Sequence, residues 1–170
     1  LSDALAAQAG FQLDGRIVQG LTPRAAQALG IAVVHQLPAL LHELTVAENL
    51  LLGSDGAFID WRQRRARARE LLAVVEADID PDTVAGSLPL PSQQLVQIAR
   101  ALRQQPRVLV LDEPTAVLPE HEAQRLLLLV RELRAKGTAV LYVTHRLEEL
   151  PGFADRVTVL RDGQRVWCSP

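Results

Sequence analysis

The sequence predicts an α/β fold in which helices flank a mainly parallel sheet. Three short apolar runs without polar alternation are typical of strands that are covered on both faces. Segments with helical spacing separate the runs, and this alternation of strand and helix favours parallel pairing. Polar residues follow the runs directly, and such sheets bind ligands at the carboxyl ends of their strands. The runs are residues 31–34, 108–111 and 138–143.

The amino-terminal part of the chain predicts a hairpin and a short helix. Residues 10–19 alternate apolar and polar side chains about an Asp-Gly pair, which suits a tight turn. Thr22 and Pro23 have the chemistry of a helix cap and a first helical position. We therefore expect a helix over residues 23–29, which Gly30 can close in a left-handed conformation.

Three helices are predicted between the first two strands. Thr45 and Glu48 have capping-box spacing and predict a helix to about Leu52. Residues 60–75 favour a helix whose arginines lie mostly opposite its apolar side chains. We interpret these arginines as a solvated face rather than a nucleic-acid contact, because no aromatic residues interleave with them. Residues 92–103 carry apolar side chains at the spacing of a buried helical stripe.

The carboxyl-terminal part predicts one long helix and a second hairpin. Pro119 opens a helix that reaches about Lys136, and Gly137 can end it. Residues 156–167 contain two apolar stretches about an Asp-Gly pair, which predicts the hairpin.

Composition narrows the possible partners. The 18 basic and 20 acidic side chains nearly cancel, so we expect no nucleic-acid partner. The single cysteine, Cys168, cannot form an internal disulfide, which fits a reducing compartment. Charged residues interrupt every apolar run well short of the roughly 20 residues that a membrane helix needs, and the first residues do not resemble a signal peptide.

An acidic pair follows the second apolar run directly. A nucleotide hydrolase needs one carboxylate to hold Mg²⁺ and another to orient and deprotonate the attacking water. We assign the metal-side role to Asp112 and the general-base role to Glu113. Two exposed acids that cap a strand are the structural alternative, and the preceding buried strand weighs against it.

Two further polar residues end predicted strands. The amide of Gln36 can contact a metal or its water and sense a phosphate, and the imidazole of His145 can bind a γ-phosphate or a catalytic water. Either residue alone is also explained as a structural polar group. Together with Asp112 and Glu113, each at a strand end, they favour one shared site.

Six segments resemble the ATP-binding subunits of ABC transporters, specifically the sugar-importer branch of ribose, galactose and xylose type. They are VVHQ, LTVAENLLLG, LVQIARAL, VLVLDEPTAVL, VLYVTHRLEEL and ADRVTVLRDG. The resemblance covers almost the whole chain and implies a P-loop-NTPase-like fold with ATP and Mg²⁺ as cofactors. It implies that residues 1–170 form a partial ATP-binding domain, with a helical subdomain at approximately residues 37–88 that touches the permease.

The resemblance also implies roles for the candidate residues. Gln36 resembles the Q-loop glutamine, which contacts nucleotide and metal. Asp112 resembles the Walker B aspartate, Glu113 the catalytic glutamate and His145 the switch histidine. In this family two ATP-binding domains close head to tail over two nucleotides and drive permease subunits, so the resemblance implies a cytoplasmic protein on the inner face of the plasma membrane.

The sequence departs from the family at the Walker A motif. No G-x-x-x-x-G-K-[ST] occurs, and the only lysine, Lys136, precedes Gly-Thr at a predicted helix end. In the family this motif lies just upstream of the position of Leu1, which favours a missing amino-terminal segment over evolutionary loss. Without the phosphate cradle and its lysine, we expect the chain alone to bind ATP poorly and to be inactive.

The signature motif also departs from the family. Residues 88–94, LPLPSQQ, stand in the place of LSGGQQQ. Pro89 replaces the serine, and Leu90 and Pro91 replace the two glycines. Proline removes an N–H donor, and leucine adds a side chain where backbone must approach phosphate. We therefore expect a weakened contact between residues 89–92, Ser92 included, and the opposing nucleotide.

Three functions follow from these observations. The first is an energy-coupling ATPase domain of a monosaccharide importer, represented here without its P-loop segment. The second is a non-catalytic, degenerate domain that acts as binding partner of a competent ATPase. The third is an ABC-type ATPase of DNA repair or chromosome maintenance, against which the low net charge and the absence of a coiled-coil insertion argue.

Overall fold

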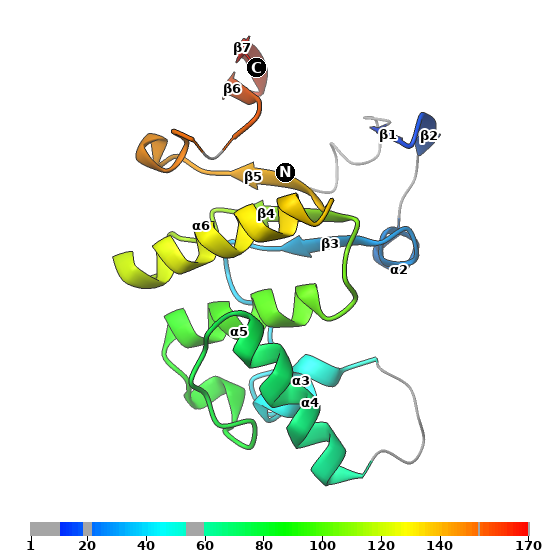
Figure 1. The fold of residues 1–170 in the computed structure, drawn as a ribbon, viewed down its shortest axis with the longest axis vertical. Coiled ribbons are helices and arrows are strands. Elements are labelled where there is room, and N and C mark those ends of the chain that lie inside the picture. Colours follow the sequence, from blue (N-terminus) through cyan, green and yellow to red (C-terminus); the bar gives the residue numbers. More distant parts are fainter. Residues whose placement is uncertain (1–10, 19–21, 54–59, 153, 170) are drawn as a thin grey trace.

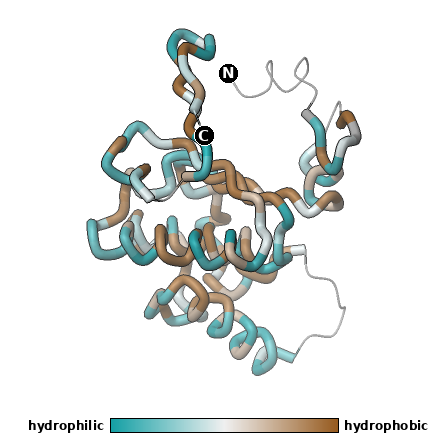
Figure 2. Tube along the Cα trace, turned by 45° about the horizontal axis from the view of Figure 1, so that its top comes forward, coloured by the Kyte–Doolittle hydropathy of each residue, from teal (hydrophilic) through white to brown (hydrophobic). Residues whose placement is uncertain are grey.

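The computed structural model describes residues 11–18, 22–53, 60–152 and 154–169. Within these residues a three-stranded sheet lies against helices, and two hairpins stand apart from it (Figure 1). Hydrophobic residues concentrate in the strands of this sheet and alternate with hydrophilic residues along the helices (Figure 2). None of the helices in the described ranges has the length and apolar character needed to cross a bilayer.

The central sheet is parallel throughout, as predicted. Val34 lies beside Leu111, and Leu111 lies beside Tyr142, so the three strands end at nearly the same level. The polar residues that follow the strands therefore collect at one edge. In spatial order the strands are β3 (Ile31–Val34), β4 (Val108–Asp112) and β5 (Ala139–Val143).

The predicted helices are present with small shifts at their ends. Thr45 and Glu48 form the expected capping box, with both reciprocal hydrogen bonds. The helix predicted over residues 92–103 begins two residues earlier, because Pro91 has the fixed φ that suits a first helical turn. The helices are α3 (Val46–Leu51), α4 (Trp61–Val74), α5 (Leu90–Leu102) and α6 (Glu120–Ala135), with single 3₁₀ turns η1 (Ala85–Ser87) and η2 (Leu147–Glu149).

One apolar core joins the helices to the sheet. Helix α5 lies between the sheet and the pair α3 and α4 (Figure 1). The core continues through buried side chains of α6, so both α5 and α6 contribute to it. The strand residues that enter this core are Val34, Leu109 and Leu111, which are 0%, 1% and 0% exposed.

The opposite face of the sheet is open. Val33, Leu141 and Val143 are 43%, 58% and 45% exposed, and register places Val33 and Leu141 on the same face. The prediction that residues 31–34 and 138–143 form strands covered on both faces is therefore wrong. No element within the described residues packs on this face, because α5 and α6 both contribute to the core on the other face.

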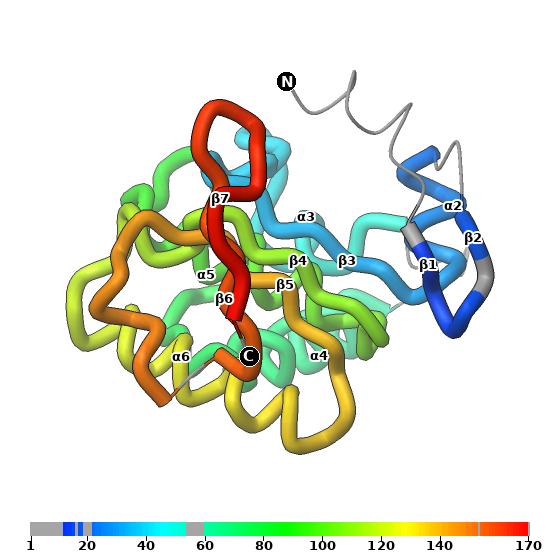
Figure 3. Tube along the Cα trace, turned by 90° about the horizontal axis from the view of Figure 1, so that it is seen from above, coloured from blue at the N-terminus to red at the C-terminus, as the bar shows by residue number. Residues whose placement is uncertain are grey.

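Both predicted hairpins are confirmed within the described residues. Asp14 and Gly15 adopt positive φ angles of 51° and 75°, which a two-residue hairpin turn requires. Asp162 and Gly163 do the same in the second hairpin. Figures 1 and 3 show the first hairpin beside α2 and the second on the β5 side of the sheet. The elements are β1 (Phe11–Leu13), β2 (Arg16–Val18), α2 (Pro23–Ala28), β6 (Val157–Arg161) and β7 (Gln164–Ser169).

Candidate active site

A carboxylate, an amide and an imidazole meet at the carboxyl edge of the central sheet. The Nε2 amide of Gln36 donates to Oε2 of Glu113 over 2.9 Å. Nδ1 of His145 lies 3.1 Å from Oε1 of the same carboxylate. These residues follow three different strands, so the parallel sheet brings together side chains such as those of Gln36 and Glu113, which lie 77 residues apart along the chain.

The backbone at Glu113 departs from strand geometry. Its φ is +46°, in the left-handed region that residues other than glycine rarely adopt. The N–H of Glu113 donates to the carbonyl oxygen of Val143 over 2.9 Å, and the next two residues, Pro114 and Thr115, are buried. A strained backbone of this kind costs of order 1–3 kcal/mol and persists where surrounding contacts hold it. The contacts around Glu113 therefore maintain this backbone conformation at the candidate site, directly after β4 ends.

The Glu113 carboxylate and the His145 imidazole differ in their access to solvent. The Glu113 side chain is 26% exposed, whereas that of His145 is 68% exposed. A water or phosphate arriving from solvent can therefore reach the imidazole and the carboxylate together. A carboxylate held by a neutral amide and an imidazole is well placed to accept a proton from a bound water.

Asp112 ends β4 and offers a free carboxylate. It forms no side-chain hydrogen bond or ion pair with any other described residue. Gln36 uses its amide nitrogen on Glu113, so its Oε1 remains available. Oxygen donors of these two types fit Mg²⁺, which takes one or two carboxylates and completes its shell with phosphate and water. Across the described residues there is no group of three or more His, Cys, Asp or Glu that could hold a metal ion.

Helix α5 holds the segment on both sides of Gln36. The Nε2 of Gln97 donates to the carbonyl of His35 over 2.8 Å, and its Oε1 accepts from the N–H of Ala39. Arg100 Nη2 donates to the carbonyl of Ala39 over 2.7 Å, and burial lowers the pKa of this guanidinium. Gln97 is 2% exposed. We did not single it out from the sequence, where a glutamine flanked by apolar residues was the available signal.

A second buried residue that we did not single out is Glu149, in η2. Its side chain is 5% exposed and accepts hydrogen bonds from Thr115, Tyr142 and Thr144. Burial is the main cause that raises the pKa of Tyr142, so its hydroxyl stays a proton donor. Nothing local in the sequence distinguishes Glu149 from the exposed Glu148 beside it, because burial of the carboxylate depends on β4 and β5.

The residues of the altered signature motif lie elsewhere, at the start of α5. Pro89 occupies the cap position without a side-chain hydrogen bond, and Leu90 is 42% exposed. Within the described residues, positions 89–92 form no side-chain hydrogen bond or ion pair with the residues at the strand ends. The structure therefore does not bring the two groups of predicted site residues together within one chain.

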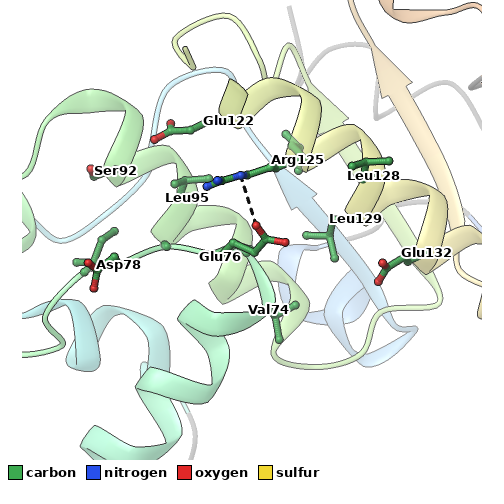
Figure 4. A pocket seen from close by; sticks show the side chains of 14 residues that line it. Val74, Glu76, Asp78, Ser92, Leu95, Glu122, Arg125, Leu128, Leu129 and Glu132 are labelled. Carbon is green, nitrogen blue, oxygen red and sulfur yellow. Dashed lines mark ion pairs between the residues drawn. The ribbon is translucent and has the colours of Figure 1, made fainter. Parts of the chain in front are cut away.

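Ser92 lines a separate pocket of about 340 Å³ between the end of α4, α5 and α6. Figure 4 shows Ser92 and Leu95 on one side and an ion pair between Arg125 and Glu76 across it, with a distance of 3.4 Å. None of the residues at the strand ends lines this pocket. It is therefore not part of the candidate active site.

The family model for ABC transporters matches residues 3–116, about two thirds of the chain. The chain belongs to the ABC transporter family. Two solved structures support the same conclusion for the fold of this ABC transporter chain. The ATP-binding cassette MJ0796 bound to ADP and Pi, in a dimeric post-hydrolysis state, is 26% identical with a TM-score of 0.80, over 92% of this chain and 71% of that chain. The ADP conformation of the cassette MJ1267 is 26% identical with a TM-score of 0.77, over 98% and 74%. The predicted P-loop-NTPase-like fold is thus confirmed.

Curated relatives of this ABC transporter chain are named as sugar import proteins. It is 46% identical over 154 residues to a putative ribose/galactose/methyl galactoside import ATP-binding protein 1 of Rhizobium meliloti, covering 91% of this chain. It is 44% identical to the ribose import ATP-binding protein RbsA of Chelativorans sp. over 92% of the chain, and 44% identical to the xylose import ATP-binding protein XylG of Photobacterium profundum over 90%. The chain spans 31% of the length of each of these relatives.

Proposed function

We propose that this chain is part of an ATP-hydrolysing subunit that powers an ABC importer of a monosaccharide. The observation that carries the proposal is the Glu113 carboxylate, which lies within 3.1 Å of both Gln36 and His145 at the end of β4. The names of the curated relatives support the import of a sugar, and the solved relative bound to ADP and Pi supports ATP as the nucleotide.

Each residue at the strand ends has a distinct role in this proposal. Glu113 orients the attacking water and accepts its proton. His145 donates a hydrogen bond to the γ-phosphate or to the same water. Its contact with Glu113 keeps the imidazole and the carboxylate in fixed relative positions. Asp112 and the Oε1 of Gln36 would hold Mg²⁺, which supplies charge neutralisation for the phosphates when bound.

The 170 residues provide no phosphate cradle of their own. They contain no Walker A motif, and backbone N–H groups with a lysine are what neutralise β- and γ-phosphates in such sites. We expect the 170-residue chain to bind ATP weakly and to be inactive alone.

The partners follow from the same proposal. A second ATP-binding domain would meet residues 89–92 across a head-to-tail interface, as the dimeric cassette supports. Residues 37–88, which include α3 and α4, would form the helical subdomain that touches the permease. The protein would then work in the cytoplasm, on the inner face of the plasma membrane.

Mg-ATP titration calorimetry and phosphate release test this function on the 170-residue chain and on the complete natural protein. We expect binding and turnover only for the complete protein, with Glu113→Gln lowering turnover about 100-fold or more. Glu132→Gln on the exposed face of α6 is the matched control and should leave turnover unchanged. Turnover that survives Glu113→Gln would contradict the assignment of the general base.

The start of α5 favours a second candidate, a non-catalytic domain that serves a competent partner. Pro91 offers no N–H in the first turn of the helix, and no side chain caps that turn. If the complete protein turns over Mg-ATP only with a second ATP-binding subunit, and Glu113→Gln in this chain leaves that turnover unchanged, this second candidate replaces the first.

A further inference from the structure

We propose that Glu149 is a positioning residue that holds the side chains of Glu113 and His145 in their positions relative to each other. The inference rests on the proposed function of those two residues. Oε1 of Glu149 accepts a hydrogen bond from the hydroxyl of Thr115 over 2.7 Å. Oε2 accepts from the hydroxyl of Tyr142 over 2.9 Å and from that of Thr144 over 3.0 Å. We call these four side chains the Glu149 network.

The network joins the two segments that carry the proposed catalytic groups. Thr115 lies two residues after Glu113, and Thr144 directly precedes His145. One carboxylate therefore contacts both segments, one through each of its oxygens. The hydroxyl of Thr144 also accepts from the N–H of Arg146 over 2.9 Å, which fixes the turn after β5.

The buried carboxylate is fully provided with donors. It is 5% exposed, and burial of a charge is costly unless it is paired and hydrogen-bonded. Three hydroxyl groups donate to it, and Nη1 of Arg146 lies 3.5 Å from Oε1. Arg146 in turn contacts Glu120 at the start of α6 and Glu148. The network is thus anchored outside the strands.

Few other polar contacts join the segment after β4, which carries Glu113, to the segment after β5, which carries His145. Among the described residues these contacts are the Glu113–His145 pair itself and the hydrogen bond from the N–H of Glu113 to the carbonyl of Val143. The backbone at Glu113 is also strained. A strained turn needs contacts that over-determine it, and Glu149 supplies them through Thr115.

Glu149→Gln in the complete natural protein removes the charge and keeps the shape. Because misplacing a reacting group by about 1 Å costs up to 100-fold, we expect the kcat for ATP to fall about 10- to 100-fold with little change in KM. The matched control is Glu148→Gln. It is the same substitution at the neighbouring residue, which is exposed and contacts Arg146 but none of the three hydroxyl donors. A fall of equal size in both variants would overturn the proposal.

A double-mutant cycle with His145→Ala separates positioning from a merely structural role. Because Glu149 also holds the segment of Glu113 through Thr115, Glu149→Gln should still lower kcat in the His145→Ala background, but by a smaller factor than in the wild type. If the two losses multiply in full, Glu149 does not act by placing His145 and the proposal is wrong.

Amide hydrogen exchange tests the network without turnover. In Glu149→Gln we expect faster exchange at the amides of Glu113 and Arg146, with unchanged exchange in α3 and α4, whereas Glu148→Gln should match the wild type. If the wild-type protein does not hydrolyse ATP, the proposed function fails, and this measurement still decides about the network. If Glu149→Gln does not fold, Thr115→Val, which removes one of the three hydroxyl donors, must show the faster exchange at the amide of Glu113. Exchange that does not change in any of these variants would overturn the proposal.

Discussion

At the scale of single residues, two buried glutamines of α5 have opposite surroundings. Gln97 is 2% exposed and bonds to the backbone of His35 and Ala39 through both ends of its amide. Gln94 is fully buried, and neither its Oε1 nor its Nε2 has a hydrogen-bond partner among the described residues. Replacing a glutamine that is hydrogen-bonded destabilises the fold, because its buried partners are left unpaired. Replacing a buried glutamine that is itself unpaired removes a group that already destabilises the fold. The same substitution should therefore have opposite effects at the two positions.

Gln97→Leu should lower the free energy of unfolding by about 1–3 kcal/mol, because it leaves the carbonyl of His35 and the N–H of Ala39 without this partner. Gln94→Leu should leave the stability unchanged or raise it by about 1 kcal/mol. Urea denaturation of both variants and the wild type is the measurement. If both substitutions lower the free energy of unfolding equally, the volume of the side chain and not its hydrogen bonding determines the stability at these positions.

At the scale of an element, α3 owes its start to local chemistry. Thr45 Oγ1 accepts from the N–H of Glu48 over 3.2 Å, and the Glu48 carboxylate accepts from the N–H of Thr45 over 2.8 Å. That backbone hydrogen bond is the main cause that lowers the pKa of Glu48 below its ordinary value of 4.5. With only six residues, α3 depends on this cap and on its buried Val46, Ala47 and Leu50.

Thr45→Ala should lower the free energy of unfolding by about 1 kcal/mol, because it leaves an amino-terminal N–H of α3 without its acceptor. Thermal or urea unfolding measures the change. Thr45→Ser keeps the hydroxyl and is the control, which should stay close to the wild type. A Ser variant as unstable as the Ala variant would point to the lost methyl group and away from the cap.

The capping box also predicts a pH dependence. A carboxyl whose pKa is lowered by folding stabilises the folded state above its ordinary pKa, and this contribution is lost as the pH falls through the lowered value. The stability difference between wild type and Glu48→Gln should thus be complete above pH 4.5 and shrink below it. Urea midpoints measured over this range test the sign. A difference that grows on acidification would contradict it.

At the scale of the whole molecule, the described residues cover the central sheet on one face only. Val33, Leu141 and Val143 are exposed on the other face within the described residues. Among the strands of the described residues, β5 pairs with β4 alone and so lies at the edge of the sheet. An exposed apolar sheet face is a site of self-association.

Light scattering coupled to gel filtration should therefore show the 170-residue chain as a concentration-dependent associated species. Leu141→Lys should shift it toward the monomer, because it places a charge on the open face. Leu128→Lys on α6 is the control, since Leu128 is 57% exposed and Leu141 is 58% exposed. A sharp monomer peak and a cooperative melt for the wild type would contradict this prediction.

Local patterns of the sequence are sufficient to predict the helices and strands and to select the candidate residues at the strand ends. The cap at Thr45, the turn at Asp14 and the apolar run before Asp112 act over a few residues, so their chemistry is readable in order along the chain. The parallel order of the sheet then accounts for the meeting of Gln36 with Glu113. The predicted start of α5 is two residues late, because the two prolines at the beginning of this helix do not resemble a helical pattern.

Only the tertiary structure decided which face of the sheet is covered and which polar residues support the site. The sequence alone determined an α/β fold with acids, an amide and an imidazole at the ends of its strands. The apolar character of Leu141 is the same whether or not an element packs on it, so its exposure cannot be read from its own segment. Glu149 and Gln97 likewise gain their roles from partners 34 and 62 residues away. Burial and hydrogen bonding of this kind depend on contacts between distant segments, and these exist only after the chain has folded.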